Sequence, residues 1–459
     1  MIRHPFPIPK NSPFPVTNIP FGIFSRNDEH IAHPGVALGD YVLDLQALIR
    51  RGMAANETFG SQSTLNDFAA LPADLRCTFR RQIQLTVEDS TSVLYSERLA
   101  AADDPLAIPR SEVTMHLPMR IGSFTDFMCA HEHVQNVGRL AGYDAVPPNF
   151  FEIPLAYNGK ASSVIVSGKP VRRPHGIFPS GGPGTTTTPP PLPGYAPTRK
   201  LDYEVKMGIF VSRPVEYGTS VPASRARAHI QLYEMTPLGP FNGKSAATSI
   251  SPWVVTLDAL EEAGALGPHL ADNPAAAGAG AGGAARSVRS GKDTTVPFLQ
   301  CSDDISVQVT SYISRDKGRT KEKLATSDLK HLHWSPFQML AHQSSSGCGL
   351  STGDLVGTGT LSSSAEQAAA AAAETASSAG SSDSERGGER RRRTGRLGCL
   401  QEIVMGGAEP VRLSDGSQLT WIEDGDTVLL EGWAGTGDRR IGFGTVSNMV
   451  VPAAEDMGF

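Results

Sequence analysis

Residues 201–211 read LDYEVKMGIFV, and 202–211 predict a β-strand that carries charged side chains within an apolar run. Apolar, β-branched and aromatic residues in such a short run are typical of a buried strand. Glu204 stands inside it, and burying a carboxylate is costly unless the group is paired or binds a metal. The residues by themselves favour neither a structural nor a chemical role for Glu204. The stretch therefore predicts a β-rich domain and marks Glu204 as a candidate site residue.

The pattern continues through the rest of the chain from about residue 119 to 459. Further runs predict the strands 162–168, 306–313 and 426–435. One helix is predicted over 335–346, because Ser335 can cap it and Pro336 suits its first turn. We therefore expect a strand-rich second domain over 119–459.

The chain before residue 119 predicts a separate, smaller domain over 1–118. Residues 17–50 indicate short strands and turns, with Gly39-Asp40 as a hairpin signal between apolar runs. Residues 64–100 carry the apolar stripe of a helix. We expect a small barrel-like domain with a helical arm.

The composition agrees with short strands and many turns. Of 459 residues, 47 are Gly and 34 are Pro, which excludes a coiled coil or a helical bundle. The hydrophobic fraction of 39% is diluted by three low-complexity stretches, which we predict to be insertions at 178–197, 274–285 and 362–397. The net charge of −6 provides no basic field for nucleic acid, and we interpret the isolated run 390–393 as a solvated loop.

The five cysteines are scattered and form no CxxC pair. This spacing predicts neither a disulfide framework nor a structural zinc site, and it fits a reducing compartment. No run of 18 apolar residues is present, so we expect no membrane span. The sequence thus predicts a soluble cytoplasmic protein that binds neither membrane nor nucleic acid.

Three more stretches place polar groups beside predicted strands. In 123–138, we expect His131 and His133 on a strand with both rings on one face, near Asp126, although two hydrogen-bonded histidines would explain the pair without a metal. In 237–253, Gly-Lys-Ser resembles the end of a phosphate loop, but the first glycine of that motif is missing. Residues 353–363 expose hydroxyl groups on a turn and strand, which by themselves indicate only structure.

Taken together, these motifs resemble the fumarylacetoacetase family. The matching stretches, in chain order, are FPVTNIPFGIFS (14–25), GVALGDYVLDL (35–45), YNGKASSVIVSGKPVRRP (157–174), LDYE (201–204), PLGPFNGKS (237–245), GCGLSTGDLVGTGT (347–360) and IGFG (441–444). The resemblance implies a mixed, mainly β fold, with an SH3-like N-terminal barrel and a β-roll-type catalytic domain. It also implies a homodimeric, metal-dependent hydrolase that cuts a carbon–carbon bond of a diketo acid.

The resemblance also implies roles for individual residues. His133 matches the general base that takes a proton from water, and Glu402 matches the acid that orients this histidine. Asp126 and Glu204 match metal ligands, and Lys244 matches a lysine near the metal and the developing oxyanion.

Further positions match a second-metal contact, Thr248, and the substrate pocket: Tyr157, Thr360 and Gln231. Because the implied metal ligands are hard oxygens, the resemblance implies Mg²⁺ and/or Ca²⁺ as the cofactor.

The chain departs from the family pattern at several of these positions. The family carries Glu-x-Glu where this chain has Glu204 and Lys206, so an ammonium replaces a metal-ligating carboxylate. About a dozen residues that follow the family's His-Ile, including another ligand aspartate, are missing after 229–230, and we expect the sheet to lack a strand there. Three positions that contact substrate in the family are also changed: Met128, Gly142 and Met235.

Two explanations stay open. An error in the gene model would restore the aspartate but not revert Lys206; a diverged paralogue would have another substrate or no activity. We hypothesise that the Lys206 ammonium partly replaces the cation.

The function predicted first is hydrolysis of fumarylacetoacetate to fumarate and acetoacetate, the last step of tyrosine and phenylalanine catabolism. The alternative is a catalytically impaired or silent paralogue that binds a diketo acid, a carboxylate ligand or a partner protein, or a family member with another substrate.

Overall fold

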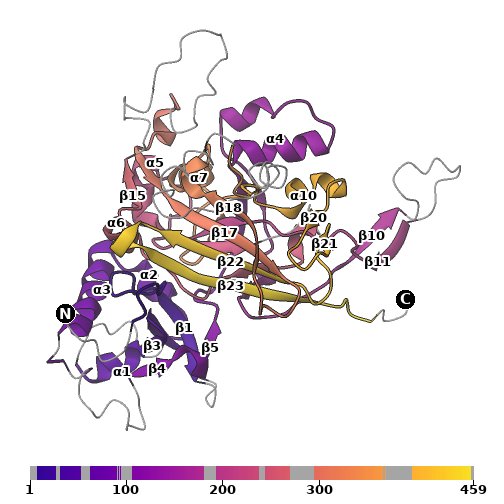
Figure 1. Cartoon of the computed structure of the whole chain (residues 1–459). Helices are drawn as coiled ribbons and strands as arrows, with labels where there is room; N and C mark the ends of the chain where they lie inside the picture. Colours follow the sequence, from indigo (N-terminus) through magenta and orange to yellow (C-terminus); the bar gives the residue numbers. More distant parts are fainter. Residues whose placement is uncertain are drawn as a thin grey trace, which may run out of the picture.

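The computed structural model describes residues 8–26, 31–52, 62–89, 91–92, 94, 106–179, 193–236, 243–268, 294–364, 367 and 395–455. It is built mainly from β-sheets, with the N-terminal elements gathered below the larger C-terminal body (Figure 1). The predicted insertion at 274–285, most of the insertions at 178–197 and 362–397, and the basic run 390–393 lie outside the described residues.

The N-terminal region is a five-stranded antiparallel sheet in the order β4-β3-β2-β1-β5. Its strands are β1 (Phe21–Arg26), β2 (His33–Leu38), β3 (Tyr41–Asp44), β4 (Ala107–Pro109) and β5 (Val113–His116). The predicted hairpin is confirmed, since Gly39 joins β2 to β3 with a φ of 57° that favours glycine.

Three helices accompany this sheet: α1 (Leu45–Arg50), α2 (Asn66–Ala70) and α3 (Ala73–Glu88). The helical prediction for 64–100 is confirmed over 66–70 and 73–88, where the structure has two helices, α2 and α3. Pro72 lacks the N–H that a helix interior requires, and α3 begins directly after it.

The C-terminal region contains a seven-stranded sheet in the order β7-β6-β19-β12-β13-β14-β8 and a five-stranded sheet in the order β18-β17-β22-β23-β9. The first sheet consists of β6 (Phe124–Met128), β7 (Leu155–Asn158), β8 (Val164–Val166), β12 (Lys206–Val211), β13 (Ile230–Thr236), β14 (Thr248–Ile250) and β19 (Leu355–Gly357). The second consists of β9 (Val171–Arg172), β17 (Val307–Ser314), β18 (Glu322–Asp328), β22 (Thr427–Ala434) and β23 (Ile441–Val451).

Smaller elements complete this region. Two-stranded pairs are formed by β10 (His175–Pro179) with β11 (Pro193–Pro197), β15 (Leu266–Pro268) with β16 (Asp303–Ile305), and β20 (Val411–Arg412) with β21 (Gln418–Leu419). The helices are α4 (His131–Leu140), α5 (Ala223–Ala226), α6 (Leu257–Glu262), α7 (Pro336–Ser344) and α10 (Leu400–Ile403). Among the described residues, no helix is long and apolar enough to cross a membrane.

Several elements confirm the sequence predictions. The runs 162–168 and 426–435 contain β8 and β22, and the run 306–313 covers all of β17 except its last residue, Ser314. The predicted helix is α7, in which the Ser335 hydroxyl accepts from the Gln338 N–H and the Gln338 side chain accepts from the Ser335 N–H. This reciprocal pair satisfies two of the free donors at the helix start and fixes where α7 begins.

The strand predicted over 202–211 is shorter than expected, since β12 begins at Lys206. Glu204 instead forms an isolated antiparallel bridge with Cys399, and the Val205 N–H donates to the Gly398 carbonyl. The LDYE motif therefore pairs with the segment that enters α10 rather than with the neighbours of β12. This backbone pairing brings Glu204 close to the residues of α10.

The expectation that the sheet lacks a strand after 229–230 was wrong. The strand β13 pairs with β12 from Lys206↔Met235 to Val211↔Ile230 and continues to β14. Ladder pairing needs extended backbone rather than particular side chains, so the residues that follow the gap complete the sheet.

Candidate active site

The two histidines of the 123–138 stretch lie on the helix α4 and not on a strand, so that expectation was wrong. Each residue turns a helix by about 100°, and residues two apart point in different directions. His131 packs beside the rings of Phe150 and Phe151, whereas His133 points toward Glu402. Only His133 is therefore placed for chemistry with Glu402.

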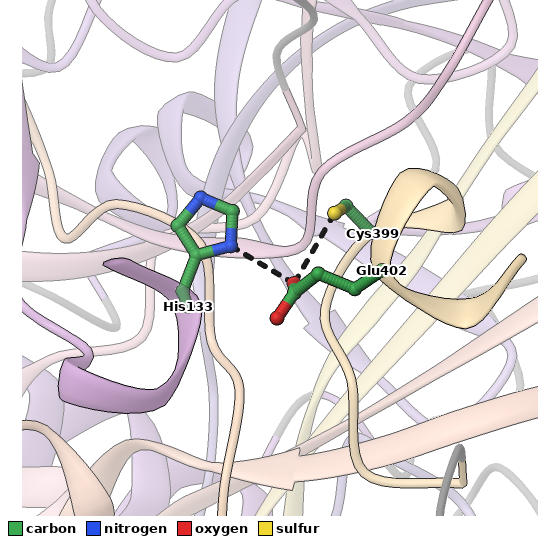
Figure 2. Close-up of side chains that lie close together, drawn as sticks. All are labelled: His133, Cys399 and Glu402. Atoms are coloured by element: carbon green, nitrogen blue, oxygen red, sulfur yellow. Dashed lines mark hydrogen bonds and ion pairs between the residues drawn. The ribbon is translucent and has the colours of Figure 1, made fainter. Parts of the chain in front are cut away.

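Glu402, on α10, is 1% exposed and lies at the centre of a hydrogen-bonded cluster (Figure 2). Its Oε2 is 2.9 Å from His133 Nδ1 and accepts from Ser362 Oγ at 2.8 Å and Cys399 Sγ at 3.2 Å, while its Oε1 accepts from Asn136 Nδ2 at 2.8 Å. Burial opposes ionisation, but His133 and the other donors lower the pKa of Glu402. The carboxylate thus accepts from Nδ1–H and leaves Nε2 as the proton acceptor of the ring.

Asp202 holds the helix that carries Glu402. Its Oδ1 accepts from the Leu400 N–H at 2.7 Å, and its Oδ2 accepts from the Gln401 N–H at 2.9 Å. Burial raises the pKa of Asp202 to about 7, although these backbone donors oppose the shift. Sequence reasoning missed this residue, and its place in the LDYE motif was the available signal.

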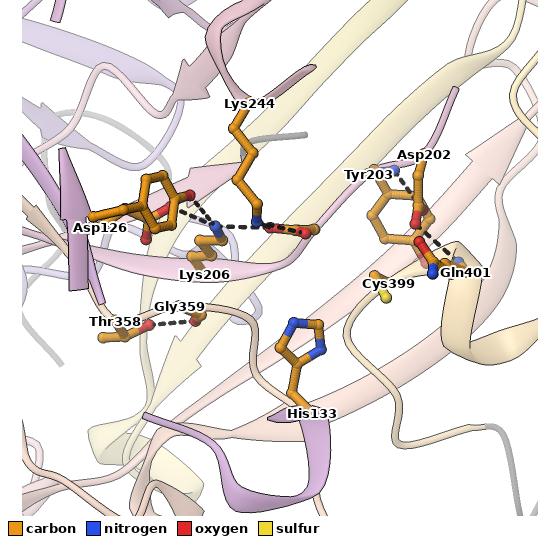
Figure 3. A network of polar contacts seen from close by, with 12 residues as sticks. Asp126, His133, Asp202, Tyr203, Lys206, Lys244, Thr358, Gly359, Cys399 and Gln401 are labelled. Atoms are coloured by element: carbon orange, nitrogen blue, oxygen red, sulfur yellow. Dashed lines mark hydrogen bonds and ion pairs between the residues drawn. The ribbon is translucent and has the colours of Figure 1, made fainter. Parts of the chain in front are cut away.

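The second cluster joins carboxylates to ammonium groups (Figure 3). Lys206 Nζ lies 2.5 Å from Asp126 Oδ2 and 2.7 Å from Glu204 Oε2. Lys244 Nζ donates to both oxygens of Glu204, at 2.9 and 2.8 Å. The Tyr157 hydroxyl donates to Asp126 Oδ2 and accepts from Lys206 Nζ at 3.3 Å.

The sheet order explains how Lys206 reaches Asp126. The strand β19 lies between β6 and β12, and its Gly357 is opposite Asp126 on one side and Gly208 on the other. Neither glycine has a side chain. Lys206 precedes Gly208 by two residues, so it lies on the same face of β12. Its long side chain can therefore extend to Asp126.

The charges of this cluster stabilise one another. Burial alone would lower the pKa of Lys206, but Asp126 and Glu204 raise it, so the group is an ammonium. Burial would raise the pKa of Glu204, but Lys206, Lys244 and His133 lower it. The two clusters are adjacent, because Glu204 forms a backbone bridge with Cys399, whose thiol donates to Glu402.

The structure shows no side-chain hydrogen bonds for the remaining predicted site residues among the described residues. Thr248 in β14 and Thr360 after β19 are buried, and neither hydroxyl has a hydrogen-bond partner among the described residues. Gln231 lies opposite Phe210 in the β12–β13 ladder, but its side chain is outside what the structure describes. A cavity of about 970 Å³ lies among α3, the 213–229 segment and α6, and no candidate site residue lines it.

Comparison with known proteins identifies the family. Residues 17–118 match the model described as "Fumarylacetoacetase N-terminal", and residues 123–451 match "Fumarylacetoacetate (FAA) hydrolase C-terminal". This chain belongs to the fumarylacetoacetase family. The fumarylacetoacetase of Emericella nidulans is 35% identical, with 98% of each chain covered. The fumarylacetoacetase of Mus musculus is 30% identical, over 97% of this chain and 98% of that protein.

A more distant likeness is found among solved structures. The fumarylacetoacetate hydrolase of Exiguobacterium antarcticum is 14% identical, with a TM-score of 0.45 over 95% of this chain and 100% of that one. This likeness is too distant to support an argument about the site.

The fumarylacetoacetase family binds a divalent metal, and among the described residues one group of three potential ligand side chains has its ligand atoms within 4.8 Å of one another: His133, Cys399 and Glu402. These residues do not fit an ion. Burial raises the pKa of Cys399 well above its ordinary value, so it is a thiol, whereas a metal binds the thiolate. The carboxylate of Glu402 already accepts four hydrogen bonds.

The position between Asp126 and Glu204 does not fit an ion either. The facing oxygens of these two carboxylates already bind Lys206 Nζ. The arrangement in this structure is a salt-bridged network, and the ammonium is its central cation.

Proposed function

We propose that this chain hydrolyses fumarylacetoacetate to fumarate and acetoacetate, the last step of tyrosine and phenylalanine catabolism. The observation that carries this proposal is the pairing of His133 Nδ1 with the ionised Glu402, next to the ammonium groups of Lys206 and Lys244. Curated fumarylacetoacetases that match nearly the whole chain support the choice of substrate. The silent-paralogue alternative is not favoured, because fumarylacetoacetases match nearly the whole chain, and the hydrogen-bonded pair of His133 and Glu402 supports an active site.

The proposed reaction begins when His133 Nε2 takes a proton from water. The water oxygen bonds to the ketone carbon of the fumaryl group, which gives a tetrahedral oxyanion, and the Glu402 carboxylate stabilises the imidazolium that forms. The oxyanion then collapses to the new carboxyl group of fumarate, which loses its proton to solvent. The bond from this carbon to the methylene between the two ketones breaks, and its electron pair passes to the acetoacetate unit as an enolate. The enolate carbon takes up the proton from His133. One water is consumed, and fumarate and acetoacetate are released.

Lys244 is the cation that we assign to the enolate. Its side chain is 19% exposed, in contrast to 1% for Lys206, so it is the ammonium that substrate can approach. A positioned ammonium at a developing oxyanion is a common source of transition-state stabilisation.

Tyr157, Thr360 and Gln231 are the proposed substrate contacts. The unpartnered, buried hydroxyl of Thr360 supports its role, because a substrate oxygen would satisfy it. Met128, Gly142 and Met235 cannot supply the hydroxyl and guanidinium groups that the family places there, so we expect weaker substrate binding than in the family.

We do not propose that a metal takes part in this reaction, although the resemblance implies Mg²⁺ and/or Ca²⁺. Asp126, Glu204 and Thr248 offer oxygen ligands, with Lys244 beside them, and this chemistry favours Mg²⁺ or Ca²⁺ over zinc. Because Lys206 holds the position between the two carboxylates, we derive no step through an ion.

The fold type of each domain, the cellular location and the oligomeric state are also proposals. We assign an SH3-like barrel to 1–118 and a β-roll-type catalytic domain to 119–459, supported by the up-and-down order of the N-terminal strands. We propose a cytoplasmic homodimer. All five cysteines are free, which supports a reducing compartment, and the dimer follows from the family.

The test is loss of the diketo absorbance of fumarylacetoacetate with the purified chain. We expect His133→Ala to lower kcat about 100-fold or more, the usual contribution of a general base. His131→Ala, on the same helix, is the matched control and should retain activity. Background rates for both the wild type and His133→Ala would overturn the proposal.

A further inference from the structure

We propose that Lys206 replaces the divalent cation of the family, so that the site of this chain works without a bound metal. The Lys206 side chain is 1% exposed, and its ammonium lies between carboxylates that come from different parts of the chain, at 2.5 Å from Asp126 and 2.7 Å from Glu204. Tyr157 completes the surroundings of this ammonium at 3.3 Å.

The number of ligands argues against a divalent ion here. Mg²⁺ and Ca²⁺ take about six or more oxygen ligands, of which several are usually carboxylates. In the described network, Asp126 and Glu204 are the only carboxylates, and the oxygen of each that faces the other binds Lys206. The second oxygen of Asp126 has no partner among the described residues, but a single oxygen beside an ammonium does not make a coordination shell.

The charge balance leads to the same conclusion. The cluster contains two carboxylates, Asp126 and Glu204, and two ammonium groups, Lys206 and Lys244, so its charges cancel. A divalent ion added to this buried cluster would leave two uncompensated positive charges next to an ammonium. The repulsion would be strong, because a buried site screens charges poorly.

Lys206 acts as a positioning residue in this proposal. It is too buried to touch substrate, but it holds Glu204, and both oxygens of Glu204 hold the ammonium of Lys244. Lys244 also lies over the Tyr157 ring, 5.2 Å from its centroid. Lys206 thus neutralises the carboxylates that would otherwise bind the metal. Lys244 is the ammonium that contacts the enolate. The role of Lys244 toward the enolate rests on the proposed function. The proposal that Lys206 takes the place of the metal does not depend on that function.

The first experiment measures metal in the wild-type chain. Protein purified without chelator is incubated with Mg²⁺, Ca²⁺ or Mn²⁺, passed through gel filtration, and analysed by elemental mass spectrometry and thermal unfolding. We expect no stoichiometric ion and no change of melting temperature on adding EDTA. One ion per chain, with a melting temperature that falls in EDTA, would overturn the proposal.

The second experiment changes the charge at position 206. Lys206→Glu recreates Glu-x-Glu, and we expect Mg²⁺ or Ca²⁺ to raise its melting temperature. Lys206→Met, of similar length without charge, should gain no response to either ion. An equal lack of response in both variants would contradict the proposal, since position 206 would then not decide metal binding.

These outcomes separate the metal from the reaction. A metal-free wild type that does not hydrolyse fumarylacetoacetate would refute the proposed function and leave this inference standing. Hydrolysis that stops in EDTA, together with a bound ion, would refute the inference and leave the function standing.

Discussion

The Glu402 carboxylate is the residue on which the proposed chemistry depends most directly. It is buried, ionised and bonded to His133 Nδ1, so it sets the ring tautomer and stabilises the imidazolium. Ser362 donates to the same oxygen but does not touch the histidine in the described contacts. Substitutions at Glu402 and at Ser362 can therefore be compared: the first removes the charge of the carboxylate, and the second removes only one hydrogen-bond donor to it.

We expect Glu402→Gln to lower kcat about 100-fold or more, because the amide can donate to Nδ1 and favour the wrong tautomer. Steady-state hydrolysis of fumarylacetoacetate measures this effect. Ser362→Ala, which keeps the carboxylate, should lose much less. Equal losses in the two variants would show that the charge of Glu402 is not required.

The lowered pKa of Glu402 also predicts a pH dependence of stability. A carboxyl group with a depressed folded-state pKa stabilises the fold above its ordinary pKa of 4.5, and this contribution is lost as pH falls through the folded-state value. Urea unfolding of wild type and Glu402→Gln from pH 7 to pH 3 should give a free-energy difference that shrinks only below about pH 4.5. A difference that stays constant over this range would contradict the assigned ionisation.

At the scale of elements, the helix α10 is too short to be stable by itself, since it has four residues. Its first N–H groups are satisfied by Asp202, which belongs to the LDYE motif far away in the sequence. The position of Glu402 therefore depends on a contact between two segments rather than on helix propensity.

We expect Asp202→Ala to destabilise the fold by about 2 kcal/mol, because it removes the acceptor of three partly buried N–H groups, those of Tyr203, Leu400 and Gln401. It should also lower kcat through displacement of Glu402. Asp202→Asn, which keeps one acceptor oxygen, should recover part of both losses. Urea unfolding and hydrolysis rates check this, and a kcat unaffected in the alanine variant would show that Asp202 does not position Glu402.

At the scale of the whole molecule, Arg80 joins the N-terminal helices to the C-terminal body. It is buried on α3 and binds Asp258 at 2.9 Å and Glu262 at 2.6 Å, both on α6. It also donates to the carbonyl of Asn18 at 3.2 Å. Nearby, Phe210 of β12 packs in the same hydrophobic cluster as the N-terminal sheet. The seven-stranded sheet, which includes β12, therefore packs against the N-terminal region.

We expect Arg80→Met to lower the free energy of unfolding by about 2 kcal/mol, since charged hydrogen bonds to carboxylates and carbonyls are lost together. Arg81→Met, at the exposed neighbouring position, is the control and should change stability by less than about 0.5 kcal/mol. Equal unfolding midpoints for the two variants would show that Arg80 does not hold the two regions together.

Local patterns were the most reliable basis of the sequence prediction. The turn at Gly39 and the capped start of α7 follow from interactions among residues a few positions apart, and both are present. The predicted strand over 202–211 and the predicted gap after 229–230 failed for a common reason. Backbone pairing with distant segments decides where a strand begins and whether it forms, and such pairing is not written in a local pattern.

The sequence by itself determined the family, through motifs in a fixed order, and marked Asp126, His133, Glu204 and Glu402 as site candidates. It also showed that an ammonium stands where the family has a carboxylate. Only the tertiary structure decided that Lys206 lies between Asp126 and Glu204, and that Asp202 supports Glu402. The physical reason is the separation along the sequence of the residues that interact. Motifs and helix caps depend on neighbours along the chain, whereas the meeting of buried charges depends on the order of strands in the folded sheet.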